Sequence, residues 1–243
     1  MTERIVIIGG TSGIGLAAAE RQLAQGREVV ITGRDADRLA AALEKLRKLG
    51  GAATGRSVDA RDEAAMRAFF TGLGAVDHVV ITATGASAAG PFKDLAVDEL
   101  RTAVEGKLVA QTVAAQAALD VLAPEGSLTF ITAGSSGASL PGTAGLAAVN
   151  AAVEAMVPVL AVELAPVRVN AVSPGVIATP WWDWMPAEAR QQAFDSYAKV
   201  TPAGRVGAAE DIADAIGYLI GNSYTTGTVL SVDGGLRLNA AAL

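Results

Sequence analysis

The chain contains no cysteine and a single histidine, His78. The absence of cysteine excludes disulfide bonds, thiolate metal sites and a cysteine nucleophile. One histidine is too few for a histidine-rich metal site and leaves almost no material for serine–histidine catalysis, so we expect no bound metal. His78 stands between Asp77 and the apolar residues Val79–Ile81, at the entrance of an expected strand, where a structural role is favoured.

The sequence also has no basic stripe and no long uninterrupted apolar run. Its formal net charge of −6 argues against nucleic-acid binding. About 18 apolar residues are needed to cross a membrane, and Asn150, Glu154 and Glu163 interrupt the best candidate. The first expected strand follows Thr2–Arg4 directly, with no signal peptide before it. These features predict a cytoplasmic protein that binds neither nucleic acid nor membrane.

Aromatic residues make up only 5% of the 243 residues, whereas apolar residues make up 51%. A composition rich in alanine and poor in aromatics suits helices that pack closely on a sheet. The length is sufficient for one large α/β domain with a substantial core. Because no repeat or linker divides the chain, we expect a single domain over residues 1–243.

The most informative stretch is Ile5–Gly15, in which four apolar residues lead into a cluster of glycines and the start of a helix. Such a turn presents free backbone N–H groups and the positive end of the helix dipole at one point. Glycines there permit the sharp turn, the approach of a pyrophosphate and the packing of helix on strand. A tight turn without a ligand is the alternative, but the flanking strand and helix favour a dinucleotide site. The residues predicted to hold the cofactor here are Gly9, Thr11, Ser12, Gly13, Ile14 and Gly15.

Apolar strand patterns alternate with helical patterns along the chain. This alternation predicts parallel strands joined by right-handed crossovers. The fold class is therefore α/β, a single-domain Rossmann-like doubly wound sheet of about seven parallel strands with helices on both faces. Expected strands cover 5–8, 28–32, a segment ending at 57–59, 76–82, 128–132, 167–172 and 229–232, and expected helices cover 16–25, 36–49, 62–73, 97–122 and 143–164.

Two charged residues, Arg34 and Asp35, follow the second expected strand, where dinucleotide-binding proteins select their cofactor. An acid there holds the ribose 2′-OH of NAD, whereas an arginine accommodates the 2′-phosphate of NADP. Asp35 stands where a helix N-cap is expected, so Arg34 favours NADP(H), with NAD(H) possible. A solvated loop charge is the plainer interpretation of Arg34. Asp59 is a candidate for the adenine amino group, or for the cap of the helix that starts near Arg61.

In sheets of this kind the ligand lies outside the carboxyl ends of the strands. Small and polar residues follow several of the expected strands, so we expect them to form one cleft. Besides the residues named above, those predicted to contact the cofactor are Ala60, Ala83, Thr84, Gly85, Asn150, Pro174, Gly175, Ile177 and Thr179.

These motifs resemble the short-chain dehydrogenase/reductase family over nearly the whole chain. Gly9, Gly13 and Gly15 match the TGxxxGxG turn of that family, with Ile8 where threonine is usual. The resemblance implies an NAD(P)-binding fold and a homotetramer or homodimer built on two long helices. The further matches are Asp59 after the third strand, the Pro-Gly motif within Val169–Gly175, Thr179 at the position that binds the nicotinamide carboxamide, Gly204–Gly207 and Val232–Gly235.

The same resemblance implies a catalytic set of asparagine, serine, tyrosine and lysine, and the sequence departs from it. Aligned on the Ala-Ala-Val-Glu that follows, Leu146 takes the tyrosine position and Asn150 the lysine position. The serine position falls on Ala133 and the asparagine position on Lys107. A leucine cannot transfer a proton, and general acid–base help is worth about 10²–10⁴-fold. The chain's tyrosines are Tyr197, Tyr218 and Tyr224, and the last two are expected to pack.

Three residues are the candidates to replace this machinery. Lys107, on a helix that faces the cleft, can act as a proton donor, since burial lowers a lysine pKa. The alternative is a lysine that reaches solvent or pairs with Glu105 or another acid. Asn150 can hydrogen-bond the nicotinamide ribose. Ser135 or Ser136 can orient a substrate oxygen, although a glycine-rich loop needs small polar residues in any case.

The segment 179–203 follows the Pro-Gly motif and holds all three tryptophans of the chain. The resemblance implies that a substrate lid begins here. Clustered tryptophans near a cleft favour an apolar or aromatic substrate, or a lid that closes over the nicotinamide and excludes water. Packing at a subunit interface is the alternative. The lid residues predicted to face the substrate are Trp181, Trp182, Trp184 and Tyr197.

The leading hypothesis is an NADP-dependent oxidoreductase of short-chain dehydrogenase/reductase type with an atypical active site and a small, apolar carbonyl or alcohol substrate. The protein must then orient and polarise the substrate, because hydride transfer is the chemistry of the cofactor. The replaced catalytic residues leave two alternatives open. One is a non-catalytic NADP(H)-binding sensor or scaffold protein, and the other is non-redox chemistry in the same pocket.

Overall fold

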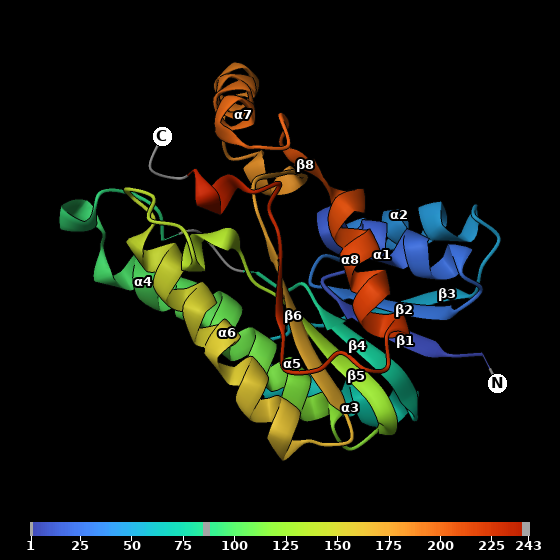
Figure 1. The fold of residues 1–243 in the computed structure, drawn as a ribbon. Coiled ribbons are helices and arrows are strands. Elements are labelled where there is room, and N and C mark those ends of the chain that lie inside the picture. Colours follow the sequence, from blue (N-terminus) through green and yellow to red (C-terminus); the bar gives the residue numbers. More distant parts are fainter. Residues whose placement is uncertain (1, 85–87, 240–243) are drawn as a thin grey trace.

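The computed structural model describes residues 2–84 and 88–239, and its centre is a seven-stranded parallel sheet (Figure 1). The strand order β3-β2-β1-β4-β5-β6-β9 shows that the chain winds from the middle of the sheet to one edge and then to the other. This is the doubly wound arrangement predicted from the sequence. The strands of the sheet are β1 (Arg4–Ile8), β2 (Glu28–Gly33), β3 (Ala53–Ser57), β4 (Val76–Ile81), β5 (Leu122–Ile131), β6 (Arg168–Pro174) and β9 (Val229–Val232).

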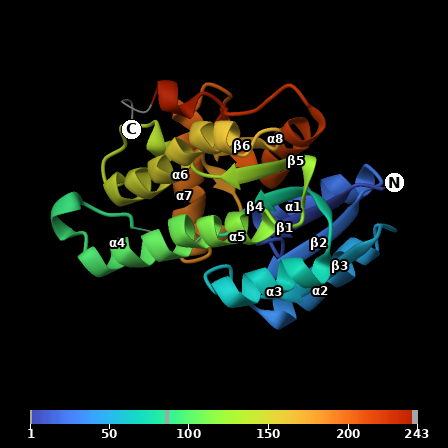
Figure 2. The same ribbon diagram turned by 90° about the horizontal axis from the view of Figure 1, so that it is seen from below.

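Helices cover both faces of the sheet (Figures 1 and 2). A short parallel pair, β7 (Ile177–Ala178) with β8 (Gly207–Ala208), lies outside the main sheet. Helix α7 projects away from the sheet (Figure 1), and none of its residues is buried. The helices are α1 (Gly13–Ala24), α2 (Ala36–Arg47), α3 (Glu63–Leu73), α4 (Val97–Ala103), α5 (Ala110–Ala118), α6 (Ala144–Glu163), α7 (Ala187–Val200) and α8 (Ala209–Gly221).

Two hydrophobic cores lie on the two faces of the sheet. Strand side chains alternate between the faces, so Ile5 and Ile7 of β1 join one core while Val6 and Ile8 join the other. The first core packs against α1, α2 and α8, and the second against α3, α5 and α6. Burial on both faces explains why β1 reads as a continuous apolar run. The carboxyl ends of the strands lie along one edge of the sheet because the strands are parallel.

The long helix expected over 97–122 differs from the structure at two places. It ends at Ala118, and β5 begins at Leu122, earlier than the expected start at residue 128. Pro124 does not suit a helix interior, and Leu122 pairs with Val76 before a register shift in the ladder. Between α4 and α5 the helix also widens into a π-helical segment over Val104–Val109.

Helix α6 is 20 residues long with a mean hydropathy of 1.8, so length and composition alone would allow it to cross a membrane. We expected Asn150, Glu154 and Glu163 to make this segment unsuitable for crossing a membrane, and by length and hydropathy that expectation is wrong. The helix nevertheless packs on the sheet, because Val153 and Val157 are buried in the second hydrophobic core. Glu154 accepts hydrogen bonds from Thr132, directly after β5, and from Ser173 of β6, and these contacts pack one face of α6 against the sheet.

The single histidine, His78, lies in β4 and is 5% exposed. Its Nδ1 is 2.8 Å from Ser127 Oγ on the neighbouring strand, and its Nε2 is 3.8 Å from Glu3 Oε1. Burial lowers the pKa of the imidazole below its ordinary value of 6.5. These contacts give His78 a structural setting within the sheet.

Candidate active site

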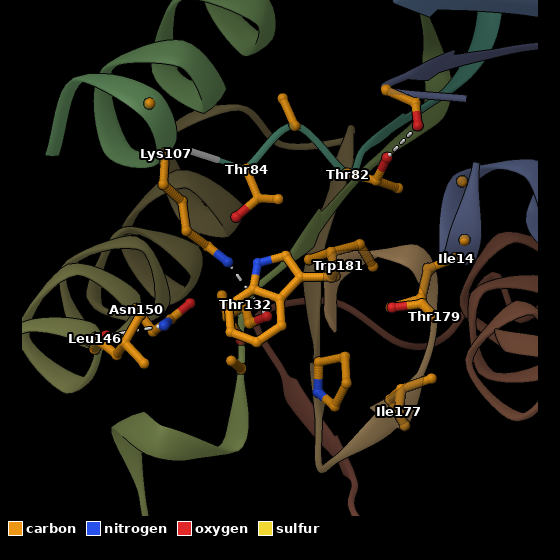
Figure 3. Close-up of a pocket in the computed structure, with 18 of the residues that line it drawn as sticks. Ile14, Thr82, Thr84, Lys107, Thr132, Leu146, Asn150, Ile177, Thr179 and Trp181 are labelled. Carbon is orange, nitrogen blue, oxygen red and sulfur yellow. Dashed lines mark hydrogen bonds between the residues drawn. The ribbon is translucent and has the colours of Figure 1, made fainter. Parts of the chain in front are cut away.

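A cavity of about 680 Å³ opens at the carboxyl ends of the strands. Its walls come from the glycine turn after β1, the ends of β2, β4, β5 and β6, the π-helical segment, α6 and the start of the lid. In Figure 3, Lys107 and Asn150 reach into this cavity from neighbouring helices. Every described residue that the sequence predicted to bind the cofactor lines this cavity, whereas Gly85 lies outside the described residues.

The glycine turn forms the floor of the cavity. Gly9 and Gly13 have φ angles of +90° and +50°, which favour glycine. A Cβ on Gly15 would collide with the Gly9 carbonyl oxygen and lie 2.8 Å from Thr82 Oγ1. Among the described residues no side chain caps the N-terminus of α1, so its first N–H groups face the cavity as an anion site.

The two charged residues that follow β2, Arg34 and Asp35, have different roles. Asp35 caps α2, because its Oδ1 accepts hydrogen bonds from the Asp37 and Arg38 N–H groups at 2.9 and 3.0 Å. That carboxylate is therefore engaged as the expected N-cap, while Arg34 lines the cavity with an exposed side chain. Arg38 also lines it and donates to Ser12 Oγ at 3.0 Å. Arg38 was not predicted as a site residue. Its position in the first turn of α2 brings its side chain to the glycine turn.

Asp59 lines the cavity beside Ala60 and forms an ion pair with Arg61, with Oδ2 2.6 Å from Nη2. The hydrogen bond from the Arg61 side chain lowers the pKa of Asp59. The alternative that Asp59 caps the following helix is wrong, because Asp62 caps α3 by accepting from the Ala65 N–H at 2.9 Å. Asp59 Oδ1 instead accepts a hydrogen bond from the Arg61 backbone N–H at 3.0 Å, within the turn that precedes α3.

The end of β4 is tied directly to the glycine turn. The Thr82 hydroxyl is within hydrogen-bond distance of the carbonyl oxygens of Ile8 and Gly9, at 2.9 and 3.0 Å. The two following residues, Ala83 and Thr84, line the cavity. Thr82 was not predicted as a site residue, and its role depends on a contact between strands far apart in the sequence.

Lys107 is buried in the cavity wall with 9% of its surface exposed. The π-helical segment carries it, and such segments often occur at functional sites. Its Nζ donates to the Thr132 carbonyl oxygen at 3.3 Å. Burial lowers the pKa of Lys107 to about 8, opposed in part by the negative charge of Glu154. The alternative of a lysine that reaches solvent is therefore wrong, and among the described residues the acid that acts on Lys107 is Glu154, not Glu105.

Asn150 projects from α6 beside Lys107 (Figure 3) and is 2% exposed. Its Nδ2 donates to the Leu146 carbonyl oxygen at 2.8 Å and lies 3.3 Å from Ser135 Oγ. Its Oδ1 is buried without a hydrogen-bond partner in the part of the chain that the structure describes. A buried acceptor of this kind is costly unless a ligand supplies a donor. Ala133 and Leu146 complete this part of the wall with side chains that carry no ionisable group.

A hydroxyl cluster that the sequence did not predict lies behind this wall. One carboxylate oxygen, Glu154 Oε1, is 2.7 Å from the hydroxyls of Thr132 and Ser136 and 3.0 Å from that of Ser173. Thr132 connects this cluster to Lys107, since its carbonyl oxygen accepts from the lysine Nζ. Ser136 therefore has a structural partner, whereas Ser135 faces the cavity.

The opposite wall follows β6. Pro174, Gly175, Ile177 and Thr179 line the cavity. A Cβ on Gly175 would lie 2.7 Å from the Cα of Asp233, which explains the need for glycine in the Pro-Gly motif. This packing holds the start of the lid against the C-terminal segment.

The aromatic residues of the lid form one cluster. Trp181, Trp182 and Tyr197 line the cavity. Trp182 packs edge-on against Trp181 with ring centroids 4.9 Å apart, and its Nε1 donates to the Ile177 carbonyl oxygen at 3.0 Å. Trp184 stacks on Trp182 but is not part of the cavity wall and is 63% exposed, so its predicted place at the substrate is wrong.

The two remaining tyrosines lie on the surface. Tyr218 is 51% and Tyr224 99% exposed, so the expectation that both pack is wrong. The Tyr218 hydroxyl is 3.1 Å from the Asn222 amide nitrogen, a contact at the surface end of α8. Tyr197 is therefore the tyrosine that lies at the cavity.

The cavity fits a dinucleotide in its size, its uncapped helix N-terminus and the unpaired acceptor of Asn150. The basic side chains of Arg34 and Arg38 lie at one end of the cavity, and Lys107 and Asn150 lie with the apolar residues of α6. A phosphate-bearing ligand suits the first group of residues, and an uncharged reacting group suits the second.

Comparisons with known proteins agree with this geometry. A family model described as "Enoyl-(Acyl carrier protein) reductase" matches residues 9–237. A short-chain dehydrogenase/reductase of Stachybotrys chlorohalonatus is 31% identical over 97% of both chains. The crystal structure of a small-chain dehydrogenase in complex with NADPH is 35% identical, with a TM-score of 0.85 over 98% of this chain and 100% of the other.

A second solved structure is a variant of actinorhodin polyketide ketoreductase with NADPH. It is 28% identical and has a TM-score of 0.88 over 97% of both chains. The family match spans most of the chain, and the glycine turn, the parallel sheet and the cavity are what that match predicts. The chain therefore belongs to the short-chain dehydrogenase/reductase family of oxidoreductases.

Proposed function

We propose that the chain is an NADP(H)-dependent oxidoreductase in which Lys107, rather than a tyrosine, holds the proton exchanged with a small apolar carbonyl or alcohol substrate. One observation carries this proposal: Lys107 Nζ is buried in the same cavity as the glycine turn. The positions that the family resemblance assigns to serine and tyrosine hold Ala133 and Leu146, and both line that cavity.

The cofactor assignment rests on the basic end of the cavity and on the two neighbouring structures that contain NADPH. Arg34 and Arg38 would hold the 2′-phosphate, because Asp35 is engaged in capping α2. The uncapped N-terminus of α1 would receive the pyrophosphate, and Asn150 Oδ1 would accept from a ribose hydroxyl. When bound, NADPH supplies the hydride.

Lys107 and the residues around it supply the protein's own contribution to the proposed reaction: proton transfer, orientation of the substrate and exclusion of water. A buried lysine with a pKa of about 8 can donate a proton to a developing alkoxide near neutral pH and recover it from water. Ser135 can orient the substrate oxygen, since its hydroxyl faces the cavity. Leu146, Trp181 and Trp182 exclude water and accept an apolar body.

The direct test is NADPH oxidation with a panel of aldehydes, ketones, imines and activated alkenes, followed through the absorbance of the reduced cofactor. We expect turnover with a small apolar carbonyl compound. If NADPH binds but is not oxidised by any member of the panel, the proposal fails. A non-catalytic NADP(H)-binding protein then becomes the better interpretation, and the apolar side chains of Ala133 and Leu146 favour it.

Arg34→Ala should weaken NADPH binding by about 10- to 100-fold, since a hydrogen bond to a charged group contributes about 1.5–3 kcal/mol. The dissociation constant for NADH should not change, because NADH has no 2′-phosphate. Fluorescence titration measures both constants, and all three tryptophans lie close enough to the cavity to report on binding. Arg47→Ala is the matched control, an exposed arginine at the far end of α2, the helix that follows Arg34. A wild-type preference for NADH would contradict the role of Arg34.

The exposed apolar face of α6 supports a homo-oligomer. Val159 and Val162 are 60% and 81% exposed on this helix. Val162→Asp should lower the molar mass measured by light scattering after size exclusion, because a buried unpaired charge is costly at an interface. Leu49→Asp, at a 57% exposed position beyond α2, is the control. A wild-type monomer, or an unchanged mass in Val162→Asp, would rule out this interface.

A further inference from the structure

The hydrogen bonding of Lys107 compensates its ammonium form poorly, which favours release of the proton and formation of a neutral amine. An ammonium carries three N–H donors, and the acceptor that the described residues offer to Nζ is the Thr132 carbonyl oxygen at 3.3 Å. A charged group with a single long hydrogen bond is poorly compensated when buried. A neutral amine requires less, and it has a lone pair with which Lys107 can react with a molecule in the cavity that it lines.

The charged groups near Lys107 are few. Glu154 of α6 acts on it from behind the wall, and its Oε1 is already shared by the hydroxyls of three residues. Glu105, on the same π-helical segment, acts on Arg61 instead. The neighbours Thr132, directly after β5, and Asn150 of α6 are uncharged. Burial therefore dominates, which agrees with the lowered pKa of about 8.

The cavity around the amine is shaped to hold an apolar molecule. Leu140, Leu146, Val149 and Trp181 line it, and Lys107 reaches into it from the π-helical segment (Figure 3). A lysine that is desolvated in an apolar pocket is an activated nucleophile, because a larger fraction is uncharged at neutral pH. The geometry therefore combines an uncharged amine with space for an apolar electrophile.

We propose that the Lys107 amine captures aldehydes and ketones with an apolar body as imines, a covalent activity separate from hydride transfer. The Nζ lone pair forms a bond to the carbonyl carbon, and the carbonyl π pair moves to the oxygen. That oxygen takes one proton from the attacking nitrogen through solvent and a second from solvent water, and it leaves as water when the C=N bond forms. The hydroxide left in the solvent then takes the remaining N–H proton, which gives the neutral imine. No oxidant or reductant is consumed.

The test uses 1-phenylbutane-1,3-dione as the probe, added to the protein with NADP⁺ so that no hydride is available. A 1,3-diketone that condenses with an amine gives a stable enaminone, which absorbs in the near ultraviolet. We expect that absorbance, together with an intact-mass gain equal to the diketone minus one water. Peptide mapping should place the adduct on Lys107.

Exposed lysines in the same protein are the internal control. Lys48 and Lys93 have side chains that are 72% and 83% exposed. Because burial lowers the pKa of Lys107 to about 8, Lys107 should react first at pH 7.5, and the peptides of the exposed lysines should remain largely unmodified. Lys107→Arg keeps a positive charge without a free amine and should abolish the adduct.

Three results would overturn the proposal. They are the absence of an adduct in the wild-type protein at pH 9, an adduct distributed over lysines according to exposure, and an undiminished adduct in Lys107→Arg. The peptide map of the wild-type protein decides the second result even if the variant does not fold. Because the assay needs no reduced cofactor, its failure is distinguishable from a failure of NADPH oxidation.

Discussion

Lys107→Met is expected to lower the rate of NADPH oxidation by about 10²–10⁴-fold, the usual contribution of a general acid, while leaving the dissociation constant for NADPH within a few-fold of wild type. Methionine keeps the length and apolar stem of the side chain and removes the proton. Steady-state rates and a fluorescence titration measure the two quantities. An unchanged rate would assign Lys107 a structural role, and a parallel loss of cofactor affinity would assign it to binding.

The same substitution should make the protein more stable. Wild-type Lys107 keeps a buried charge below its pKa of about 8, and removing it should raise the free energy of unfolding at pH 7 by about 1–3 kcal/mol. The folded-state pKa lies below the unfolded value of 10.5, so the unfolded chain binds more protons between these values. Wild-type stability should therefore rise from pH 8 to 10.5 relative to the variant. A variant less stable than wild type at pH 7 would contradict this account.

Lys107→Arg is the matched control for both effects. It keeps the positive charge but cannot release a proton, because the arginine pKa lies above 12. The rate should fall as in Lys107→Met, while the gain in stability should be absent. Recovery of activity in the arginine variant would mean that charge alone, rather than proton transfer, supports the reaction.

Gly15→Ala is expected to weaken NADPH binding on the order of a hundredfold, the equivalent of one or two lost hydrogen bonds to a charged group. The new Cβ would collide with the Gly9 carbonyl oxygen and lie 2.8 Å from Thr82 Oγ1, so the glycine turn must shift. The overpacking should also lower the free energy of unfolding by about 1–3 kcal/mol. Cofactor titration and chemical denaturation measure the two changes.

Gly72→Ala provides the control for a glycine within a helix. Gly72 lies in α3, and a Cβ there would meet no atom within 4 Å. Alanine should therefore stabilise the protein by about 0.5–1 kcal/mol through helix propensity without changing cofactor affinity. If Gly15→Ala behaved like Gly72→Ala, the glycine turn would not be the cofactor site.

The sheet and the cofactor cavity could be predicted from the sequence because each depends on local patterns. Apolar runs such as Ile5–Ile8 fill positions buried on both faces, and β1 lies where that run predicts. The small and polar residues after the strands meet at one edge because parallel strands share their direction. The N-cap role of Asp35 was also predictable, since it depends on residues two and three positions away.

The parts that escaped prediction depend on contacts between distant segments. The Glu154 cluster joins α6 to β5 and β6, and no spacing along the chain announces that its carboxylate will meet three hydroxyls. The same holds for the contact of Arg38 with Ser12. Trp184 shares its sequence neighbourhood with Trp181, but the 3₁₀ turn over Pro180–Trp182 directs the two side chains differently.

The pH dependence of single-turnover NADPH oxidation tests the central role of Lys107 most directly. With the best substrate of the carbonyl panel, the wild-type rate should fall as the pH rises through about 8, because the lysine loses the proton that it donates. The reverse reaction, alcohol oxidation with NADP⁺, should rise over the same range. A reduction rate that stays constant to pH 10, or the same profile in Lys107→Met, would contradict the account.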